Sequence, residues 1–223
     1  MTESKHFIIA DDHPLFRAAL QQAVSSLAPD CTIREAESLS GLQDELEDSG
    51  KADLILLDLN MPGANGFSGL IFIRSHYPHI PVVVVSACED ANVMRQAIEY
   101  EAAGYIAKSS SLDDISTALQ FVLDGNIYLP EKARQHVYAI QPKDKDLAER
   151  LASLTPQQFR VLSMMTEGML NKQIAYDLTV SEATVKAHVT AIFRKLGVRT
   201  RTQAVIAVQA LDIERSDTNQ TIA

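Results

Sequence analysis

Five short apolar segments, each followed by a stretch whose apolar residues recur at helical spacing, dominate the first half of the chain. The third and fourth segments, LILLDL and VVVVS, are apolar without alternation, which is typical of inner strands in a parallel sheet covered on both faces. We therefore expect a doubly wound α/β domain with helices on both sides of the sheet. The expected strands span residues 6–10, 32–36, 54–59, 82–86 and 104–107, and the expected helices span residues 14–27, 38–47, 65–76, 92–101 and 112–123.

The net charge of the chain changes sign along its length. Residues 1–150 carry 12 Lys and Arg against 23 Asp and Glu, whereas residues 151–223 carry 8 against 6. Because 223 residues fit two small domains as well as one large one, this asymmetry favours two domains. The expected parts are a first domain at 1–126, a linker at 127–152, a second domain at 153–213 and a flexible tail at 214–223.

Composition and segment length exclude several classes of protein. Hydrophobic residues make up 46% and charged residues 22%, which argues against disordered, collagen-like and coiled-coil chains. The apolar runs are far shorter than the roughly 20 residues that a bilayer span requires, and the N-terminal segment MTESKHFIIADD is too polar for a signal peptide. We therefore expect a cytoplasmic protein with no membrane partner. Cys31 and Cys88 have no CxxC spacing and are predicted to be buried free thiols.

Polar side chains follow four of the expected strands at the point where each strand ends. Asp11 and Asp12 follow the first strand, Asp58 lies near the end of the third, Ser86 ends the fourth and Lys108 follows the fifth. In an open parallel sheet these ends converge where the winding order reverses. Three carboxylates at one point require a compensating cation, and oxygen ligands with room for water favour Mg²⁺. The sequence therefore predicts a magnesium site at this edge.

A bound cation, an ammonium group and a hydroxyl together suit a phosphoryl group, whose charge spreads over three oxygens. Asp58 on the central strand is the predicted nucleophile, and the main-chain carbonyl of Asn60 can face the metal. Lys108 is expected to pair with the phosphoryl oxygens and Ser86 to donate a hydrogen bond to one of them. Taken singly, each of these residues could equally be a cap, a turn former or a surface charge. Their joint placement at one edge favours the site.

Four segments carry a resemblance to a known family: IIADDHPLFRAAL, LILLDLNMPGANG, VVVVSA and AAGYIAKS. Over residues 5–126 the chain resembles the receiver domain of two-component response regulators, which implies a flavodoxin-like (βα)5 fold. The resemblance implies that a sensor histidine kinase phosphorylates Asp58 and that Asp11 and Asp12 hold Mg²⁺, with Asp12 the more direct ligand. It also assigns Ser86 and Tyr105 as switch residues, with serine at a position where threonine is commoner.

The second half reads as a small all-α domain of four helices, expected at residues 156–167, 172–178, 182–196 and 202–211. The second and third of these form a helix-turn-helix with Ser181 as N-cap of the third. Between residues 154 and 209 there are 7 Lys and Arg against 3 Asp and Glu, so the region is basic within an acidic chain. This balance is weak evidence for binding a polyanion.

The helix at 182–196 has an apolar stripe and an opposite face of small and basic residues, which suits the major groove of double-stranded DNA. A merely solvated helix face is the alternative. On this exposed side we expect three residues to face bases and Arg194 to lie beside them. The residues expected toward bases are Lys186, Ala187 and Thr190. The residues expected toward phosphates are Lys172, Thr184, His188 and Lys195.

The segments NKQIA, SEATVKAHV and RKLGVRTRTQAV resemble the LuxR-type DNA-binding domain of the NarL/FixJ response regulators over residues 153–211. Leu170 stands where that family usually has a Ser or Thr cap and Gln173 replaces the usual glutamate, so Asn171 is expected to cap the helix instead. The last helix, TQAVIAVQAL, is apolar on nearly every side and requires cover, either from the bundle or from a second copy. The resemblance implies a homodimer in the active state.

The whole sequence is therefore interpreted as a two-component response regulator in which phosphorylation of Asp58 controls dimerisation and sequence-specific binding to promoter DNA. By family analogy, the unphosphorylated receiver is expected to cover Lys186 and its neighbours. One rival is an enzyme, a phosphohydrolase of the haloacid-dehalogenase type, but position 60 is Asn where that chemistry needs a second aspartate. The other rival is a phosphorylation-independent or ligand-controlled LuxR-type regulator.

Overall fold

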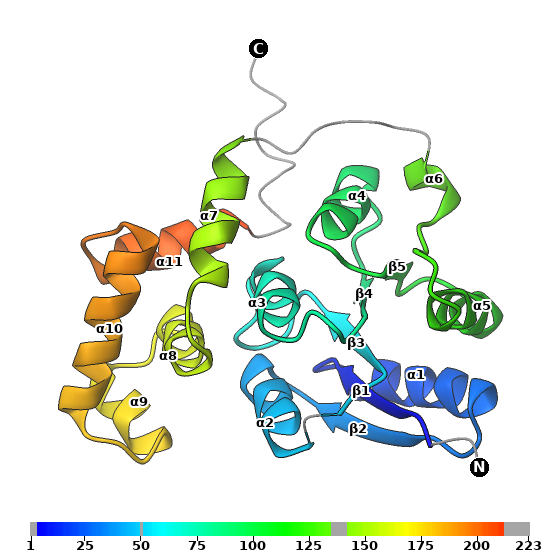
Figure 1. Ribbon diagram of the computed structural model, residues 1–223, viewed down its shortest axis with the longest axis horizontal. Helices are drawn as coiled ribbons and strands as arrows, with labels where there is room; N and C mark the ends of the chain where they lie inside the picture. The colour runs from blue at the N-terminus through cyan, green and yellow to red at the C-terminus, as the bar shows by residue number, and fades with distance from the viewer. Residues whose placement is uncertain (1–3, 50, 135–141, 212–223) are drawn as a thin grey trace.

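A five-stranded parallel sheet forms the centre of the first domain in the computed structural model, which describes residues 4–49, 51–134 and 142–211 (Figure 1). The strands are β1 (His6–Ala10), β2 (Thr32–Ala36), β3 (Leu54–Asp58), β4 (Val82–Ser86) and β5 (Gly104–Ala107). Their spatial order is β2-β1-β3-β4-β5, so β3 is central. Every residue of β3 and β4 is buried, as the unbroken apolar segments predict. The doubly wound α/β fold is confirmed, with β3 ending one residue earlier than expected.

Helices cover both faces of this sheet (Figure 1). One face is covered by α1 (Pro14–Leu27) and α5 (Leu112–Leu123). The other is covered by α2 (Leu39–Ser49), α3 (Ser68–His76) and α4 (Ala91–Glu99). Because successive strand residues point to opposite faces, Phe7 and Ile9 enter the first core while Ile8 and Ala10 enter the second.

The helix α3 begins later than the expected start at residue 65. Gly63 and Gly66 in the preceding loop have left-handed backbone conformations, with φ values of 80° and 55°. Such a backbone cannot continue a right-handed helix, so α3 begins only at Ser68. The loop between β3 and α3 is longer as a result, and it lies between Asp58 and the second domain.

Within the described residues, every regular element after β5 is a helix. The four helices predicted for the second domain are present as α8 (Pro156–Thr166), α9 (Asn171–Asp177), α10 (Glu182–Leu196) and α11 (Arg201–Gln209). Two more, α6 (Glu131–Arg134) and α7 (Pro142–Ala152), lie in the segment expected to be a linker. The Ser181 hydroxyl accepts a hydrogen bond from the Thr184 amide and caps α10 as expected. None of the helices in the described ranges is both long and apolar enough to cross a membrane.

Two smaller predictions are wrong. Asn171 is the first residue of α9 rather than its cap; the cap position is held by Leu170, whose amide donates to Gln173 Oε1 at 2.7 Å. Leucine has no polar side-chain atom, so the glutamine supplies the capping bond by reaching back. Cys31 and Cys88 are free thiols but are only half-buried.

The two domains pack directly against each other. Three hydrogen bonds connect the loop between β3 and α3 to the second domain, and the Phe72 and Phe159 rings stack with centroids 4.2 Å apart. The three bonds run from Ser163 Oγ to the Gly63 carbonyl (2.8 Å), from Asn65 Nδ2 to Thr166 Oγ1 (2.9 Å) and from the Phe67 amide to the Leu211 carbonyl (3.2 Å). Figure 1 shows α7 and α8 beside α2 and α3, with α10 on the far side from the sheet.

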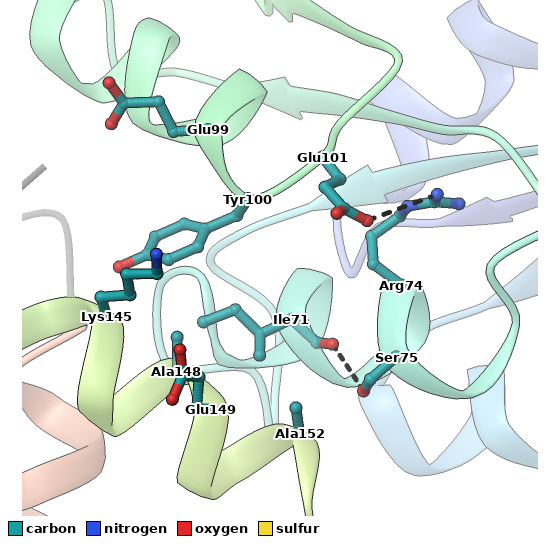
Figure 2. A pocket seen from close by; sticks show the side chains of 10 residues that line it. All are labelled: Ile71, Arg74, Ser75, Glu99, Tyr100, Glu101, Lys145, Ala148, Glu149 and Ala152. Atoms are coloured by element: carbon teal, nitrogen blue, oxygen red, sulfur yellow. Dashed lines mark hydrogen bonds and ion pairs between the residues drawn. The ribbon is translucent and has the colours of Figure 1, made fainter. Parts of the chain in front are cut away.

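A groove of about 730 Å³ lies where α7 meets the ends of α3 and α4 (Figure 2). Arg74 and Glu101 form an ion pair of 3.7 Å on the side of the groove formed by the first domain, and Lys145 of α7 lies beside Tyr100. In a parallel α/β domain the C-terminal ends of the helices lie at the amino ends of the strands. The groove is therefore at the opposite edge of the sheet from Asp58, and marks incomplete packing between the domains.

Candidate functional site

The structure brings the predicted carboxylates together at the carboxyl edge of the sheet. Asp58 ends β3 with its side chain 2% exposed, and Asp11 directly follows β1 with its side chain 1% exposed. Asp12 is more open, with a side-chain exposure of 33%. One ligand atom from each of these residues and from His13 lies within 4.8 Å of all the others. Strand ends in neighbouring positions thus form one acidic cluster, which we define as Asp11, Asp12 and Asp58.

Lys108 bridges two members of the acidic cluster from the end of β5. Its Nζ lies 2.7 Å from Asp11 Oδ2 and 2.8 Å from Asp58 Oδ2, and it also lies 5.0 Å from the centre of the Phe16 ring. Burial alone would lower the pKa of the Lys108 ammonium, but the two carboxylates raise it above its usual value. The ammonium is therefore held charged against the carboxylate predicted to be the nucleophile.

The donor set fits a divalent cation. Three carboxylates face a single lysine ammonium, so the cluster has an excess of negative charge that a hard cation with oxygen ligands can neutralise. Lys108 contacts Oδ2 of Asp11 and Oδ2 of Asp58, whereas the Oδ1 atom of Asp11 accepts a hydrogen bond of 2.8 Å from the His13 amide. The Asn60 amide donates to Asp58 Oδ1 at 3.1 Å and so turns the following loop back toward the cluster.

The two predicted switch residues meet at the loop that follows β4. Ser86 is fully buried, and its Oγ accepts a hydrogen bond of 3.2 Å from the Cys88 amide. Tyr105 is also fully buried, and its hydroxyl donates to the Cys88 carbonyl at 2.7 Å. Burial raises the pKa of Tyr105 well above its usual range, so the phenol is neutral. Both side chains therefore hold the same loop. This loop follows β4, which pairs with β3, the strand that ends at Asp58.

Sequence reasoning missed Arg17, which supports the acidic cluster from α1. Its side chain is 9% exposed, Nη1 donates to the Asp11 carbonyl at 2.7 Å and Nε donates to Glu35 at 2.8 Å. Nη2 contacts Glu37. The available signal was its spacing, because Arg17 lies three residues before the buried Leu20, on the core face of the helix.

Replacing Arg17 by alanine is expected to lower the free energy of unfolding by about 2 kcal/mol, the scale for hydrogen bonds to charged groups. It should also slow phosphorylation by acetyl phosphate, because the peptide that positions Asp11 loses its donor. Urea unfolding and the rate of adduct formation measure the two effects. Arg134→Ala is the matched control: its bonds to the Leu129 carbonyl and to Glu131 are exposed and far from the cluster, so it should cost much less stability and leave the rate of adduct formation unchanged. An unchanged Arg17→Ala would contradict the assignment.

The three residues predicted to face bases, together with Arg194, form one exposed face on α10. Ala187, Thr190 and Arg194 are exposed, and Lys186 is exposed with its ammonium 2.9 Å from Glu182. Val185, Ile192 and Leu196 on the other side of the helix are buried in the bundle. Of the residues predicted to contact phosphates, Lys172 and Thr184 are exposed and His188 is half-buried.

Comparison with known proteins gives the same division of the chain. Residues 7–120 match the response regulator receiver domain, and residues 152–208 match the bacterial regulatory proteins of the luxR family. The chain is 44% identical over 216 residues to the glycerol metabolism activator of Pseudomonas putida, covering 92% of this chain and 95% of the relative. It is 34% identical over 208 residues to the nitrate/nitrite response regulator protein NarL of Escherichia coli K12, with the same coverage. The chain belongs to the NarL/FixJ family of response regulators.

Solved structures show the same fold. RcsB from Salmonella enterica serovar Typhimurium, bound to promoter P1flhDC in the presence of the phosphomimetic BeF3⁻, aligns with a TM-score of 0.56 at 22% identity, covering 94% of this chain and all of that one. As a NarL/FixJ-family member, this protein is a two-component response regulator that binds DNA to regulate transcription, and it is not an enzyme. The phosphohydrolase interpretation is thereby set aside.

Two expectations for this NarL/FixJ regulator need correction in the light of its geometry. The receiver does not cover Lys186 or Ala187, because it packs on α7, α8 and the end of α11 and leaves the outer face of α10 open (Figure 1). The Lys195 ammonium, expected at a phosphate, already donates to the Ser153 carbonyl and to Gln158 Oε1, each at 2.7 Å. Lys195 therefore holds α10 against the start of α8.

Proposed function

We propose that Asp58 accepts a phosphoryl group from the phosphohistidine of a sensor histidine kinase and that this event controls dimerisation and sequence-specific binding to promoter DNA in the cytoplasm. The bridge from Lys108 to Asp58 and Asp11 carries the proposal, because it places a fixed positive charge beside a buried carboxylate at an open edge of the sheet. We assign phosphate acceptance to residues 1–126 and DNA binding to residues 153–213, joined by the linker at 127–152.

The residues around Asp58 have distinct roles in the transfer. A carboxylate oxygen of Asp58 attacks phosphorus, the phosphorus–nitrogen bond of the phosphohistidine breaks, and the imidazole leaves. Lys108 pairs with the transferred oxygens, and Ser86 donates a hydrogen bond to one of them. When Mg²⁺ is bound, it would neutralise part of the phosphoryl charge. Its ligands would be Asp11, Asp12, Asp58 and the main-chain carbonyl of Asn60.

The loop after Asp58 offers a direct connection to the second domain. Gly63 and Phe67 in this loop share hydrogen bonds with Ser163 and Leu211. A change at Asp58 that shifts the loop alters its contacts with α8 and with the end of α11. The two arrangements of the loop and the second domain are in equilibrium. Phosphorylation can shift this equilibrium only by the difference in free energy with which the phosphoryl group favours one arrangement over the other.

We assign DNA binding to the outer face of α10 and dimerisation to the pairing of two copies of the chain. Lys186, Ala187 and Thr190 face bases, Arg194 lies beside them, and Lys172, Thr184 and His188 face phosphates. Ile206 on α11 is 54% exposed, an apolar side chain available for a second copy. One relative by fold, RcsB, is described as two dimers bound to two parallel DNAs, which supports a dimeric output here.

A selection from a pool of random DNA duplexes, using the full chain treated with acetyl phosphate and Mg²⁺, tests this function. We expect enrichment of sites with two half-sites, and no comparable enrichment with the untreated protein. Equal enrichment with and without phosphorylation would favour the phosphorylation-independent regulator. No enrichment of any sequence would contradict the assignment of α10.

Lys186 and Lys195 form a matched pair for testing the DNA-facing surface. Lys186→Ala should weaken binding to a selected duplex by about 1–3 kcal/mol and relax its sequence preference at one position, because a contact to a base is lost. Lys195→Ala should leave DNA affinity and sequence preference unchanged but lower the free energy of unfolding by about 1 kcal/mol, because its bonds are internal. Fluorescence anisotropy and urea unfolding measure both. If Lys186→Ala lowers only the stability and Lys195→Ala lowers only the affinity for DNA, the two assignments are wrong and must be exchanged.

A further inference from the structure

His13 places an imidazole nitrogen inside the acidic cluster. Its Nδ1 lies 2.6 Å from Asp12 Oδ1, 3.3 Å from Asp11 Oδ1 and 3.9 Å from Asp58 Oδ2. With metal–ligand distances of about 2.1 Å, adjacent ligands of an octahedral cation are separated by roughly 3 Å and opposite ones by roughly 4 Å. The 3.3 Å and 3.9 Å distances match adjacent and opposite ligands around a single cation, whereas the 2.6 Å contact with Asp12 is a hydrogen bond whose proton a bound cation would replace.

The imidazole of His13 does not cap the helix that it precedes but contacts the carboxylates of Asp11 and Asp12. His13 is the N-cap of α1, where Ser, Thr, Asp or Asn normally bonds the first helical amides, yet its side chain makes no capping bond. Its own amide instead donates to Asp11 Oδ1 at 2.8 Å, which fixes the backbone of His13 to the acidic cluster. The side chain is turned toward the carboxylates and away from the helix.

His13 and Lys108 lie on different oxygens of Asp11, although both approach Oδ2 of Asp58, Lys108 at 2.8 Å and His13 at 3.9 Å. Lys108 contacts Asp11 Oδ2, whereas His13 Nδ1 and the His13 amide lie near Asp11 Oδ1. The His13 side chain is 64% exposed, so the Oδ1 side opens to solvent and has room for water ligands. A cation bound there meets Nδ1 without displacing Lys108.

We infer that His13 is a fourth side-chain ligand of the cation site, binding through Nδ1 in the neutral tautomer that carries its proton on Nε2. This inference rests on the proposed metal site at Asp11, Asp12 and Asp58. Imidazole suits transition cations, whereas Mg²⁺ prefers oxygen and retains water readily. His13 therefore gives the site a mixed nitrogen and oxygen donor set and shifts its preference from Mg²⁺ toward divalent transition cations.

Pulsed EPR of Mn²⁺ bound to the full-length protein tests the inference directly. We expect modulation from a directly coordinated imidazole ¹⁴N in the wild type, and its loss in His13→Ala. His13→Asn, which restores a favoured cap residue, guards against loss of folding and should also lack the imidazole signal. His79→Ala, an exposed histidine in another loop, is the control that should retain it.

Titration with Mn²⁺, and competition by Mg²⁺, gives a second measurement. His13→Ala should weaken Mn²⁺ binding about 10-fold or more, the scale on which even supporting residues alter metal affinity, and change Mg²⁺ binding much less. Mn²⁺ bound to the wild type without an imidazole signal would overturn the role of His13 and leave the metal site standing. Failure of the wild type to bind either cation would overturn both.

Discussion

Asp58→Asn abolishes the single phosphoryl adduct that acetyl phosphate and Mg²⁺ are expected to form on the wild-type chain. The amide cannot act as the nucleophile, and it no longer provides the carboxylate oxygen that Lys108 contacts at 2.8 Å. Intact mass spectrometry of the two proteins measures the effect as a change from one added phosphoryl group to none. Pairing of two copies on a selected duplex should be lost with it.

Asp124→Asn is the matched control for this experiment. Asp124 caps the end of α5 and its carboxylate accepts a hydrogen bond from the nearby Gln120. The variant should form the adduct as the wild type does. An adduct that persists on Asp58→Asn would place the acceptor elsewhere, and its absence from the wild type would leave a regulator that is controlled in another way.

Ser163→Arg is expected to separate the two domains while each of them stays folded. Ser163 is 5% exposed and donates to the Gly63 carbonyl at 2.8 Å, so a long charged side chain has no room at this contact. Overpacking together with the lost hydrogen bond costs about 3 kcal/mol, which corresponds to roughly a hundredfold shift in the equilibrium between packed and separated domains. Small-angle X-ray scattering should show an increased radius of gyration.

Two further variants separate overpacking from charge. Ser163→Ala removes only the hydrogen bond, worth about 1 kcal/mol, and should give a much smaller change. Gln203→Arg adds the same charge at an exposed position of α11 and should leave the radius of gyration unchanged. If Ser163→Arg scatters like the wild type, the contact between Gly63 and Ser163 does not hold the domains together.

Local periodicity was enough to predict most of the elements. The strands β1, β2, β4 and β5 and the helices α1, α5 and α10 have the bounds that the apolar spacing indicates. The convergence of Asp11, Asp58 and Lys108 was also predictable, because parallel strands present their carboxyl ends at one edge. The start of α3 was not, because periodicity does not report the left-handed backbone of Gly63 and Gly66.

The partners of individual polar side chains required the tertiary structure. Nothing in the local sequence distinguishes Lys186, which is exposed, from Lys195, whose ammonium is bound to Ser153 and Gln158 about 40 positions earlier in the chain. Arg17 and His13 gain their roles only when β1, β2 and β3 are assembled around the acidic cluster.

Residue spacing was thus enough to predict the α/β domain, the helical domain and the acidic cluster with Lys108. It also predicted the helix proposed to face DNA, because each of these depends on periodicity along one element or on strand ends that topology brings together. The packing of the receiver on α8 and the end of α11, which leaves Lys186 exposed, could not be predicted in this way. That packing depends on the shapes of two surfaces, such as Gly63 against Ser163 and Phe72 against Phe159, and no periodicity within either segment encodes which surfaces meet.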